Sequence, residues 1–274
     1  MPAYQPEFLR CCPAFEQLSQ PLCRHLLSLR DWPKVSEYGA LCDLVEGCDA
    51  DALPIFAEQP PPRVKAAGGY EAFVAERRCV PTRAQSWHDL FNALVWMHYP
   101  RFKWAINQVQ RSEMGSSEVD VRNRRTLVQS RAAQFDEGGM VLLTSNLNWV
   151  APLEHFAWRE FFVQGRARFD RDVHCLIVGH ALYESLQEPH LGITAKALPL
   201  LWPTADYQKD SWQARAAVDA ALAAQLPAAL RADSFLPLPL LGVPGWHPEQ
   251  TEEFYANTRY FRSGRQQSPD LATS

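Results

Sequence analysis

The strongest constraint on the fold of this chain is a helix-forming stretch at residues 87–99, WHDLFNALVWMHY, which is apolar in nearly every direction around its axis. A helix without a polar face is normally buried in a protein core. The stretch nevertheless carries His88, Asp89 and Asn92. Burying such side chains without partners costs roughly 1–3 kcal/mol each. We therefore expect them to face polar partners or a wet cavity.

The ends of this helix can be predicted from its flanking residues. Ser86 is a suitable N-cap, and Asp89 stands three residues later, where a carboxylate can return a hydrogen bond and meet the helix dipole. Pro100 ends or kinks the helix. Because His88 and Asn92 are four residues apart, they lie on one face, one turn from each other.

Two interpretations of this polar stripe remain open. In the structural one, Asp89 is only a capping residue, and His88 and Asn92 are hydrogen-bond partners inside the core. In the functional one, the three side chains line a site. Arg83, just ahead of the helix, and Lys103, beyond the proline, would then attract an anion to it.

A second group of polar residues occurs in GHALYESL, which follows the strand-like segment at 172–179. If this segment is helical, His180 and Glu184 share a face, and Gly179 allows a sharp turn from strand to helix. Such a pair can be two metal ligands, or a base with the group that orients it, but chance pairs of this kind are common. The sequence contains no HExxH, GxGxxG, Walker or GxSxG motif.

Basic residues cluster at 118–135, which we predict to be an amphipathic helix. Arg122 and Arg125 share one face of it and could bind a phosphate or a nucleic acid backbone. A solvated face paired with nearby carboxylates is the commoner use of such a pattern.

The composition narrows the class of protein. A net charge of −4 and a pI near 6.1 give no overall attraction to nucleic acid or anionic lipid, so a nucleic acid partner is possible but not favoured. The most apolar late segment, FLPLPLLGVPGW, is too short and too rich in proline to span a bilayer. Seven irregularly spaced cysteines favour reduced thiols in a cytoplasm over a disulfide scaffold or a zinc site. We expect a cytoplasmic protein with no membrane contact.

The patterns predict an α-dominated α+β fold, a helical body with two or three short strands. Strands are expected at 140–145 and 172–179, and a Pro-rich segment from Leu236 is expected to wrap the surface in extended form. Helices are expected at 14–30, 36–47, 70–77, 87–99, 118–135, 155–169, 180–187 and 211–226. We divide the chain into an N-terminal helical layer (1–60), which could belong to the same domain, a main domain (61–262) and a disordered tail (263–274), with a linker-like stretch at 57–69.

The motif VPTRxxxWHDLFNALVWxxYPRxKxxxN resembles the domain-of-unknown-function family numbered 3025, found in proteobacteria. The resemblance continues through FDEGG, GHALYE, GITAKA and PLPLLGVPGW, and so extends from about Tyr70 to Phe261. It departs from the family pattern at YP before Arg101, where FP is usual. It implies a cytosolic bacterial protein but no known reaction. The positions to which it points are Arg83, Trp87, His88, Asp89, Asn92, Lys103, Asp136, His180 and Glu184.

Three hypotheses for the function follow from these residues. The first is an enzyme acting on a small anionic substrate, nominally by metal-assisted hydrolysis. Its catalytic residues would be His88, Asp89, Asn92, His180 and Glu184, its substrate-binding residues Arg83, Trp87, Lys103, Arg122 and Arg125, and the ligands of a divalent metal would come from His88, Asp89, His180 and Glu184. The second is a non-catalytic protein that binds an anionic ligand, a nucleic acid or a protein. The third is a structural polar network. The sequence does not indicate an oligomeric state.

Overall fold

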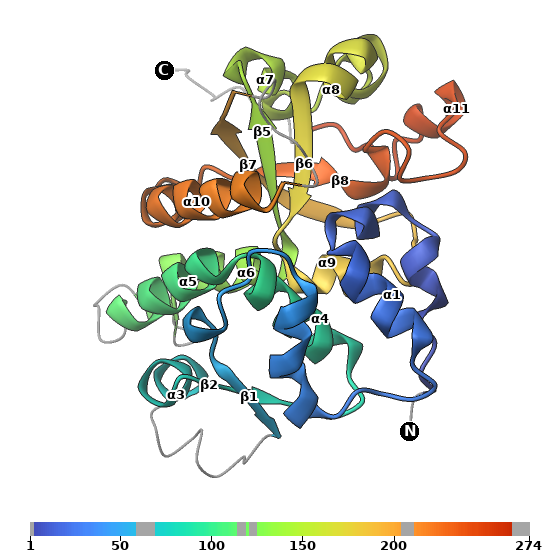
Figure 1. Cartoon of the computed structure of the whole chain (residues 1–274). Coiled ribbons are helices and arrows are strands. Elements are labelled where there is room, and N and C mark those ends of the chain that lie inside the picture. The colour runs from blue at the N-terminus through green and yellow to red at the C-terminus, as the bar shows by residue number, and fades with distance from the viewer. Residues whose placement is uncertain (1–2, 59–68, 114–118, 121–124, 204–210, 265–274) are drawn as a thin grey trace.

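The computed structural model describes residues 3–58, 69–113, 119–120, 125–203 and 211–264. Helices predominate in these ranges and surround a four-stranded mixed sheet (Figure 1). The expected fold class, an α-dominated α+β protein, is therefore confirmed, but the two or three strands expected are too few, because the main sheet alone has four. The predicted linker at 57–69 and the predicted tail at 263–274 lie almost entirely outside the described residues.

The helical elements follow one another along the whole chain. The α-helices are α1 (Gln20–Ser28), α3 (Tyr70–Arg77), α4 (Trp87–His98), α5 (Pro100–Ser112), α6 (Leu127–Gly138), α7 (Ala151–Glu154), α8 (Arg166–Asp172), α9 (His180–Ser185), α10 (Trp212–Ala232) and α11 (Glu252–Tyr255). The 3₁₀ segments are η1 (Pro6–Arg10), η2 (Pro13–Gln17), η3 (Val35–Leu44), η4 (Ala50–Ala52), η5 (Leu147–Trp149) and η8 (Leu240–Gly242), and η6 (Glu160–Gln164) is a π-helical turn.

The main sheet has the strand order β6–β5–β7–β8. β5 is antiparallel to β6 and parallel to β7, and β8 is antiparallel to β7. Every residue of β5 is buried, as expected for an inner strand with the continuous apolar run MVLL. The strands are β5 (Gly139–Thr144), β6 (Val173–Ile177), β7 (Thr194–Leu201) and β8 (Leu236–Pro239), and two smaller pairs are formed by β1 (Ile55–Glu58) with β2 (Cys79–Thr82) and by β3 (Val119–Asp120) with β4 (Arg125–Thr126). The strands expected at 140–145 and 172–179 are confirmed as β5 and β6.

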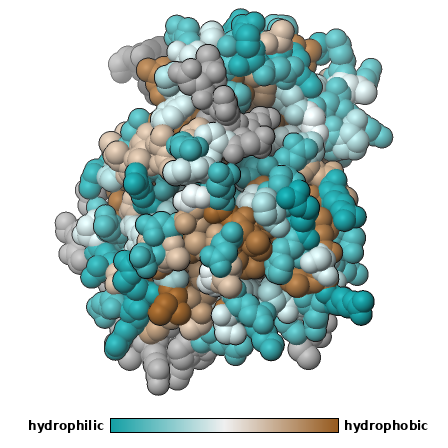
Figure 2. All heavy atoms as spheres, in the orientation of Figure 1, coloured by the Kyte–Doolittle hydropathy of each residue, from teal (hydrophilic) through white to brown (hydrophobic). Residues whose placement is uncertain are grey.

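One apolar core connects the N-terminal elements with the rest of the chain, from Leu9 to Phe261. Helices α5, α6 and α10 pack against one another, α6 also contacts β5 and β7, and η2 contacts the edge strand β6. Figure 2 shows a mostly hydrophilic surface on one face, with apolar residues scattered between polar ones. In the part of the chain that the structure describes, no helix has both the length and the apolar composition needed to cross a bilayer.

The helix expected over 118–135 starts later than predicted, at Leu127. A capping box fixes this start: the Thr126 hydroxyl accepts a hydrogen bond from the Gln129 amide at 3.0 Å, and the Gln129 side chain accepts one from the Thr126 amide at 3.0 Å. The short strands β3 and β4 precede the helix. The helix expected over 155–169 is also interrupted, by the π-helical turn η6 and Gly165.

The prediction that the Pro-rich segment wraps the surface is wrong for its first residues, because Leu236–Pro239 is the edge strand β8 of the main sheet. Proline is tolerated on an edge strand, since one side of the strand needs no backbone donor. Leu238 and Leu240 are fully buried, so the alternating leucines bind this segment into the core.

The expectation of reduced thiols alone is also corrected. Cys42 and Cys48, six residues apart, form a disulfide at the end of η3. Cys11, Cys12, Cys23 and Cys79 are free thiols. The irregular spacing of the cysteines does not predict this pair, since the pairing depends on how η3 ends.

Helix α5 lacks a side-chain cap of its own and is capped instead by Asp219 of α10. The two carboxylate oxygens accept hydrogen bonds from the Arg101 amide at 3.0 Å and the Phe102 amide at 2.8 Å. Asp219 is buried, and this burial raises its pKa to about 6, although the two amides and the nearby Arg101 and Arg215 lower it.

We predict that Asp219→Ala destabilises the protein by roughly 1–3 kcal/mol, because two buried amides of α5 lose their acceptors. Urea unfolding measures this loss. Asp233→Asn is the control: Asp233 follows the same helix and pairs with Arg131, but it is largely exposed, and asparagine tolerates its left-handed backbone conformation, so a change below about 1 kcal/mol is expected. Equal losses in the two variants would contradict the capping role.

The raised pKa of Asp219 predicts a dependence of stability on pH. The folded protein favours the protonated carboxyl, whose pKa rises from 3.8 to about 6. Its contribution to stability is therefore fully present below pH 3.8 and is lost as the pH rises through about 6. In Asp219→Asn this loss, about 2–3 kcal/mol in size, is absent. The measurement is the difference in unfolding free energy between wild type and Asp219→Asn from pH 4 to pH 7. A difference that stays constant over this range would refute the predicted pH dependence.

Candidate acid–base site

The polar stripe of α4 lies at the surface end of an otherwise buried helix. The Ser86 hydroxyl caps the helix by accepting a hydrogen bond from the Asp89 amide at 3.3 Å, as the sequence predicted. From Leu90 to His98, every residue of the helix except Asn92 is buried. His88, Asp89 and Asn92 are half-buried and contact polar groups from other elements.

The two histidines of the sequence patterns meet in space. His180 Nε2 lies 3.0 Å from His88 Nε2, with the rings edge-on at a centroid distance of 4.5 Å. The other nitrogen of His88, Nδ1, lies 2.7 Å from Glu184 Oε2. His88 is thus held between two side chains of α9, a helix that packs directly on α4.

Gly179 places His180 at this position. A Cβ atom at residue 179 would lie 2.3 Å from the Gly139 nitrogen and 2.5 Å from the Glu137 oxygen. Glycine therefore allows the end of β6 to approach the start of β5, and α9 begins at the next residue. The sequence predicted a special role for this glycine, but the reason is close backbone contact, since its φ of −87° is open to any residue.

A buried ion pair forms the second half of the site. Lys103 of α5 is 4% exposed, and its ammonium donates to Asp136 Oδ1 at 2.5 Å and to Asn92 Oδ1 at 2.9 Å. The other carboxylate oxygen of Asp136, Oδ2, lies 3.9 Å from His180 Nδ1. The polar groups therefore form one chain from Asn92 through Lys103, Asp136, His180 and His88 to Glu184, which we call the polar network.

His180 is neutral in this network. Its burial lowers its pKa to about 3, and the opposing effect of Asp136 does not restore it. Its Nδ1 atom is buried and forms no hydrogen bond with any described residue. A neutral imidazole carries one proton, on either Nε2 or Nδ1.

The tautomer of His180 determines how many protons the two histidines hold together. With the proton on His180 Nε2, that atom donates to His88 Nε2, and a neutral His88 donates from Nδ1 to Glu184. With the proton on His180 Nδ1, facing Asp136, His88 donates from both nitrogens and is positively charged. The two states differ by one proton, so this arrangement can take up or release a proton with its hydrogen-bonded contacts retained.

Asp89 and Arg83 stand apart from the network and bind each other. The guanidinium of Arg83 contacts both oxygens of Asp89, with a closest distance of 2.7 Å, and the Arg83 amide donates to the same carboxylate at 2.5 Å. The carboxylate expected to orient His88 is thus used by Arg83, and Glu184 contacts His88 instead. Lys103, expected to bind a substrate, is buried and paired with Asp136.

Trp87 belongs to an aromatic cluster beside the site. Its ring stacks on Tyr4 at 5.1 Å, lies 4.7 Å from Trp32 and meets Phe8 edge-on at 4.8 Å. An open groove of about 510 Å³ next to this cluster is lined by Trp32, Trp87 and Glu184, among others. Trp87 therefore links the apolar wall of that groove to the network residue Glu184.

The donors expected to bind a metal do not converge. Among the residues that the structure describes, no group of three His, Cys, Asp or Glu side chains is placed to hold an ion. Asp89 is engaged by Arg83, and Glu184 lies on the far side of the His88 ring from His180. The four residues thus do not fit a metal centre in this arrangement.

The two remaining substrate-binding residues of the sequence hypothesis, Arg122 and the side chain of Arg125, lie outside the described residues. Arg131, on the same predicted helix, donates to the Leu230 carbonyl at 3.0 Å and pairs with Asp233 at 3.1 Å. This arginine thus joins α6 to the end of α10.

Sequence reasoning missed Tyr70, the first residue of α3. Desolvation of its hydroxyl raises its pKa, with smaller contributions from Glu71 and Asp136, whereas a hydrogen bond with the Asn92 side chain lowers it. Tyr70 therefore extends the network beyond Asn92. The periodicity of α3 gave no signal for this, because Tyr70 reads as an ordinary residue at the start of an amphipathic helix.

We predict that the imidazole of His180 stays neutral as the pH falls and is protonated only near pH 3, because burial opposes its charge. Since its pKa falls from 6.5, its contribution to folding stability is complete above pH 6.5 and decreases as the pH falls toward 3. Nitrogen-15 NMR of the histidine rings measures the protonation. A His180 that titrates near pH 6.5, its ordinary value, would overturn this assignment.

A second prediction separates the structural part of the network from its exposed part. Lys103→Met should cost roughly 2–4 kcal/mol, because Asp136 loses its cation and Asn92 its donor. His88→Gln should change stability by less than about 1 kcal/mol, because His88 is 30% exposed and its partner Glu184 is 44% exposed. Urea unfolding compares the two variants, and a larger loss in His88→Gln would show that His88 is a structural residue.

Comparison with known proteins finds a matching family model. Residues 56–265 match the family model described as protein of unknown function, DUF3025. No curated protein matches the chain, and no solved structure does. The matched range covers more than half of the sequence and contains the whole polar network, from Tyr70 to Glu184. The chain therefore belongs to the DUF3025 family, as its motifs from Val80 to Asn107 indicated.

Proposed function

We propose that this protein is an enzyme that catalyses hydrolysis or group transfer on a small substrate by general acid–base catalysis, with His88 as the residue that exchanges the proton. The observation that carries the proposal is the placement of His88 between Glu184, 2.7 Å from Nδ1, and His180, 3.0 Å from Nε2. A base with one nitrogen fixed by a carboxylate is the arrangement by which enzymes orient a catalytic imidazole.

The exposed fractions of the three side chains support proton exchange between His88 and a substrate. The side chains of His88 and Glu184 are 30% and 44% exposed, whereas that of His180 is 6% exposed. A substrate can therefore reach His88 and Glu184 but not His180. In the base direction, His88 Nε2 exchanges its contact with His180 for a water molecule or hydroxyl group and takes a proton from that oxygen as the oxygen attacks the substrate. In the acid direction, the imidazolium returns that proton to the leaving group.

The neighbouring residues would support this exchange. Glu184 fixes the orientation of the His88 ring and stabilises its charged form. Asn92 accepts from Lys103 with its carbonyl oxygen and is also hydrogen-bonded to Tyr70, so one of the two protons of its amide nitrogen is left to polarise a substrate oxygen. Tyr70 and Asp136 position Asn92 and His180.

Arg83 is the residue we propose to bind an anionic group of the substrate. Its side chain is 60% exposed, and its Nε and Nη2 atoms contact Asp89. The Nη1 atom forms no hydrogen bond with a described residue and could bind a phosphate or carboxylate oxygen. Lys103 lacks this freedom, because it is buried and already paired.

The proposal is tested with chromogenic esters and phosphates, p-nitrophenyl acetate, p-nitrophenyl phosphate and bis-p-nitrophenyl phosphate. The wild type should turn over at least one of these substrates. In His88→Gln this turnover should be about 10²–10⁴-fold lower, because proton transfer is lost. Glu184→Gln should be impaired less severely and should shift the pH–rate profile, because it alters the charge that stabilises the imidazolium. Treatment with a chelator should leave turnover unchanged.

Glu188→Gln is the matched control, since Glu188 lines the open groove near Glu184 but makes no contact with His88. It should keep the wild-type rate. Unchanged turnover in a folded His88→Gln variant would refute a catalytic role for this histidine. A loss of turnover on chelation would instead support the metal-assisted hydrolysis expected from the sequence.

A further inference from the structure

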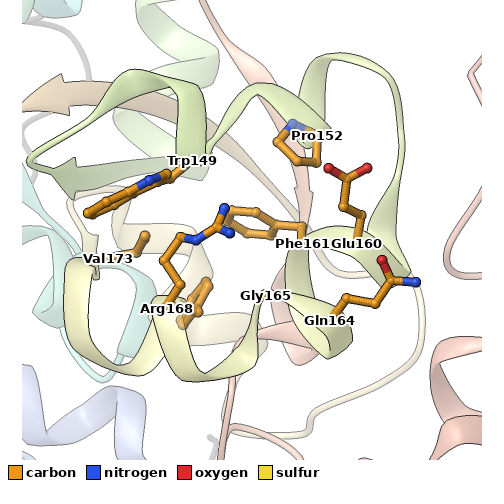
Figure 3. A pocket seen from close by; sticks show the side chains of 9 residues that line it. Trp149, Pro152, Glu160, Phe161, Gln164, Gly165, Arg168 and Val173 are labelled. Carbon is orange, nitrogen blue, oxygen red and sulfur yellow. The ribbon is translucent and has the colours of Figure 1, made fainter.

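A cavity of about 240 Å³ lies where η5, η6 and α8 meet, and it shares no residue with the polar network. Trp149 and Phe161 supply apolar walls, and Glu160 and Arg168 supply charged groups. In Figure 3 the guanidinium of Arg168 reaches toward the middle of the cavity, with Trp149 on one side and Glu160 on the other. In Figure 1 α7 and α8 lie at the opposite end of β5 and β6 from α4 and α9.

The cavity depends on an unusual backbone turn. The Gly165 amide donates to the Glu160 carbonyl at 2.8 Å, which closes the π-helical turn η6. A Cβ atom at residue 165 would lie 2.9 Å from the carbonyl oxygens of Glu160 and Phe161, so glycine is required there. Turns of this kind are rare and occur frequently at functional sites. The interruption of the helix expected at 155–169 therefore creates the cavity between η6 and α8.

The charges of this segment divide into paired ones and unpaired ones. All of residues 159–172 are described. Five of the seven charged side chains there form ion pairs: Arg159 with Glu252, Arg166 with Asp170, and Arg171 with Asp172. Glu160 and Arg168 form no ion pair or hydrogen bond through their side chains, with each other or with any other described residue. Both of them line the cavity.

We propose that this cavity binds a small zwitterion of the size of a free amino acid. Arg168 would bind its carboxylate, Glu160 its ammonium group, and Trp149 and Phe161 its apolar part. A zwitterion would pair both protein charges, which are otherwise solvated at the exposed rim of the cavity. The volume is below the roughly 300–1,000 Å³ of typical pockets for larger ligands, so the occupant must be small.

Isothermal titration calorimetry of the full-length protein with L-phenylalanine tests the proposal. Two matched probes remove one charge each: N-acetyl-L-phenylalanine lacks the ammonium group, and L-phenylalaninamide lacks the carboxylate. Wild type should bind L-phenylalanine at least about tenfold more tightly than either probe, because each charge-assisted contact contributes to binding. L-Leucine and L-tryptophan repeat the comparison with a smaller and a larger apolar part.

The variants assign each charge to its partner. Arg168→Gln should weaken L-phenylalanine binding at least about tenfold and abolish the preference over the amide, whereas Glu160→Gln should abolish the preference over the N-acetyl form. Arg171→Gln and Glu252→Gln are the controls, because both residues belong to ion pairs of the same region and lie outside the cavity. Both should bind as the wild type does.

Three results would overturn the proposal. The first is no saturable binding of any of the three amino acids to wild type. The second is equal binding of L-phenylalanine and its amide. The third is an equal loss in Arg168→Gln and Arg171→Gln. None of these measurements involves His88, so their outcome is independent of the proposed acid–base function.

Discussion

The candidate site depends on the buried ion pair between Lys103 and Asp136. A lysine that is 4% exposed is tolerable only if its ammonium is paired, and here a carboxylate and an amide oxygen provide the partners. The pair, with Asn92, joins α5, α6 and α4, and a hydrogen bond from the Gln129 side chain to the Gln110 carbonyl also links α6 to α5. Because apolar side chains can slide past one another whereas this contact cannot, the ion pair fixes the register in which α4 presents His88 and Asn92.

Gly179 and Asp219 hold the rest of the network beside this ion pair. Gly179 permits a backbone contact between the end of β6 and the start of β5 that a Cβ atom would exclude. Asp219 caps α5 from α10, and so holds the helix that carries Lys103. The acid–base groups thus lie on helices whose ends are fixed by the sheet and by a distant carboxylate. A rigid framework of this kind suits a site in which distances near 3 Å must be maintained.

The position of His180 explains why the network suits proton exchange better than metal binding. Its Nε2 atom lies at hydrogen-bond distance from His88, while both available carboxylates, Glu184 and Asp136, lie on the Nδ1 sides of the two rings. The charged oxygens therefore surround the histidine pair instead of converging on one point. Such carboxylates orient imidazoles and stabilise protonated forms, which is the part they play in the proposed reaction.

The sequence by itself determined where most helices lie, the inner strand β5 and the edge strand β6, because these follow from local periodicity and from apolar runs, but it missed the late start of α6 and the turn η6. It also determined that His88, Asn92, His180 and Glu184 are unusual, since polar residues stand out against an apolar background. Only the tertiary structure decided the partners: that Glu184 and not Asp89 contacts His88, that Lys103 is buried, and that Leu236–Pro239 joins the sheet. Partners are set by contacts between segments that are distant in sequence, and no local pattern records which of several carboxylates will be nearest.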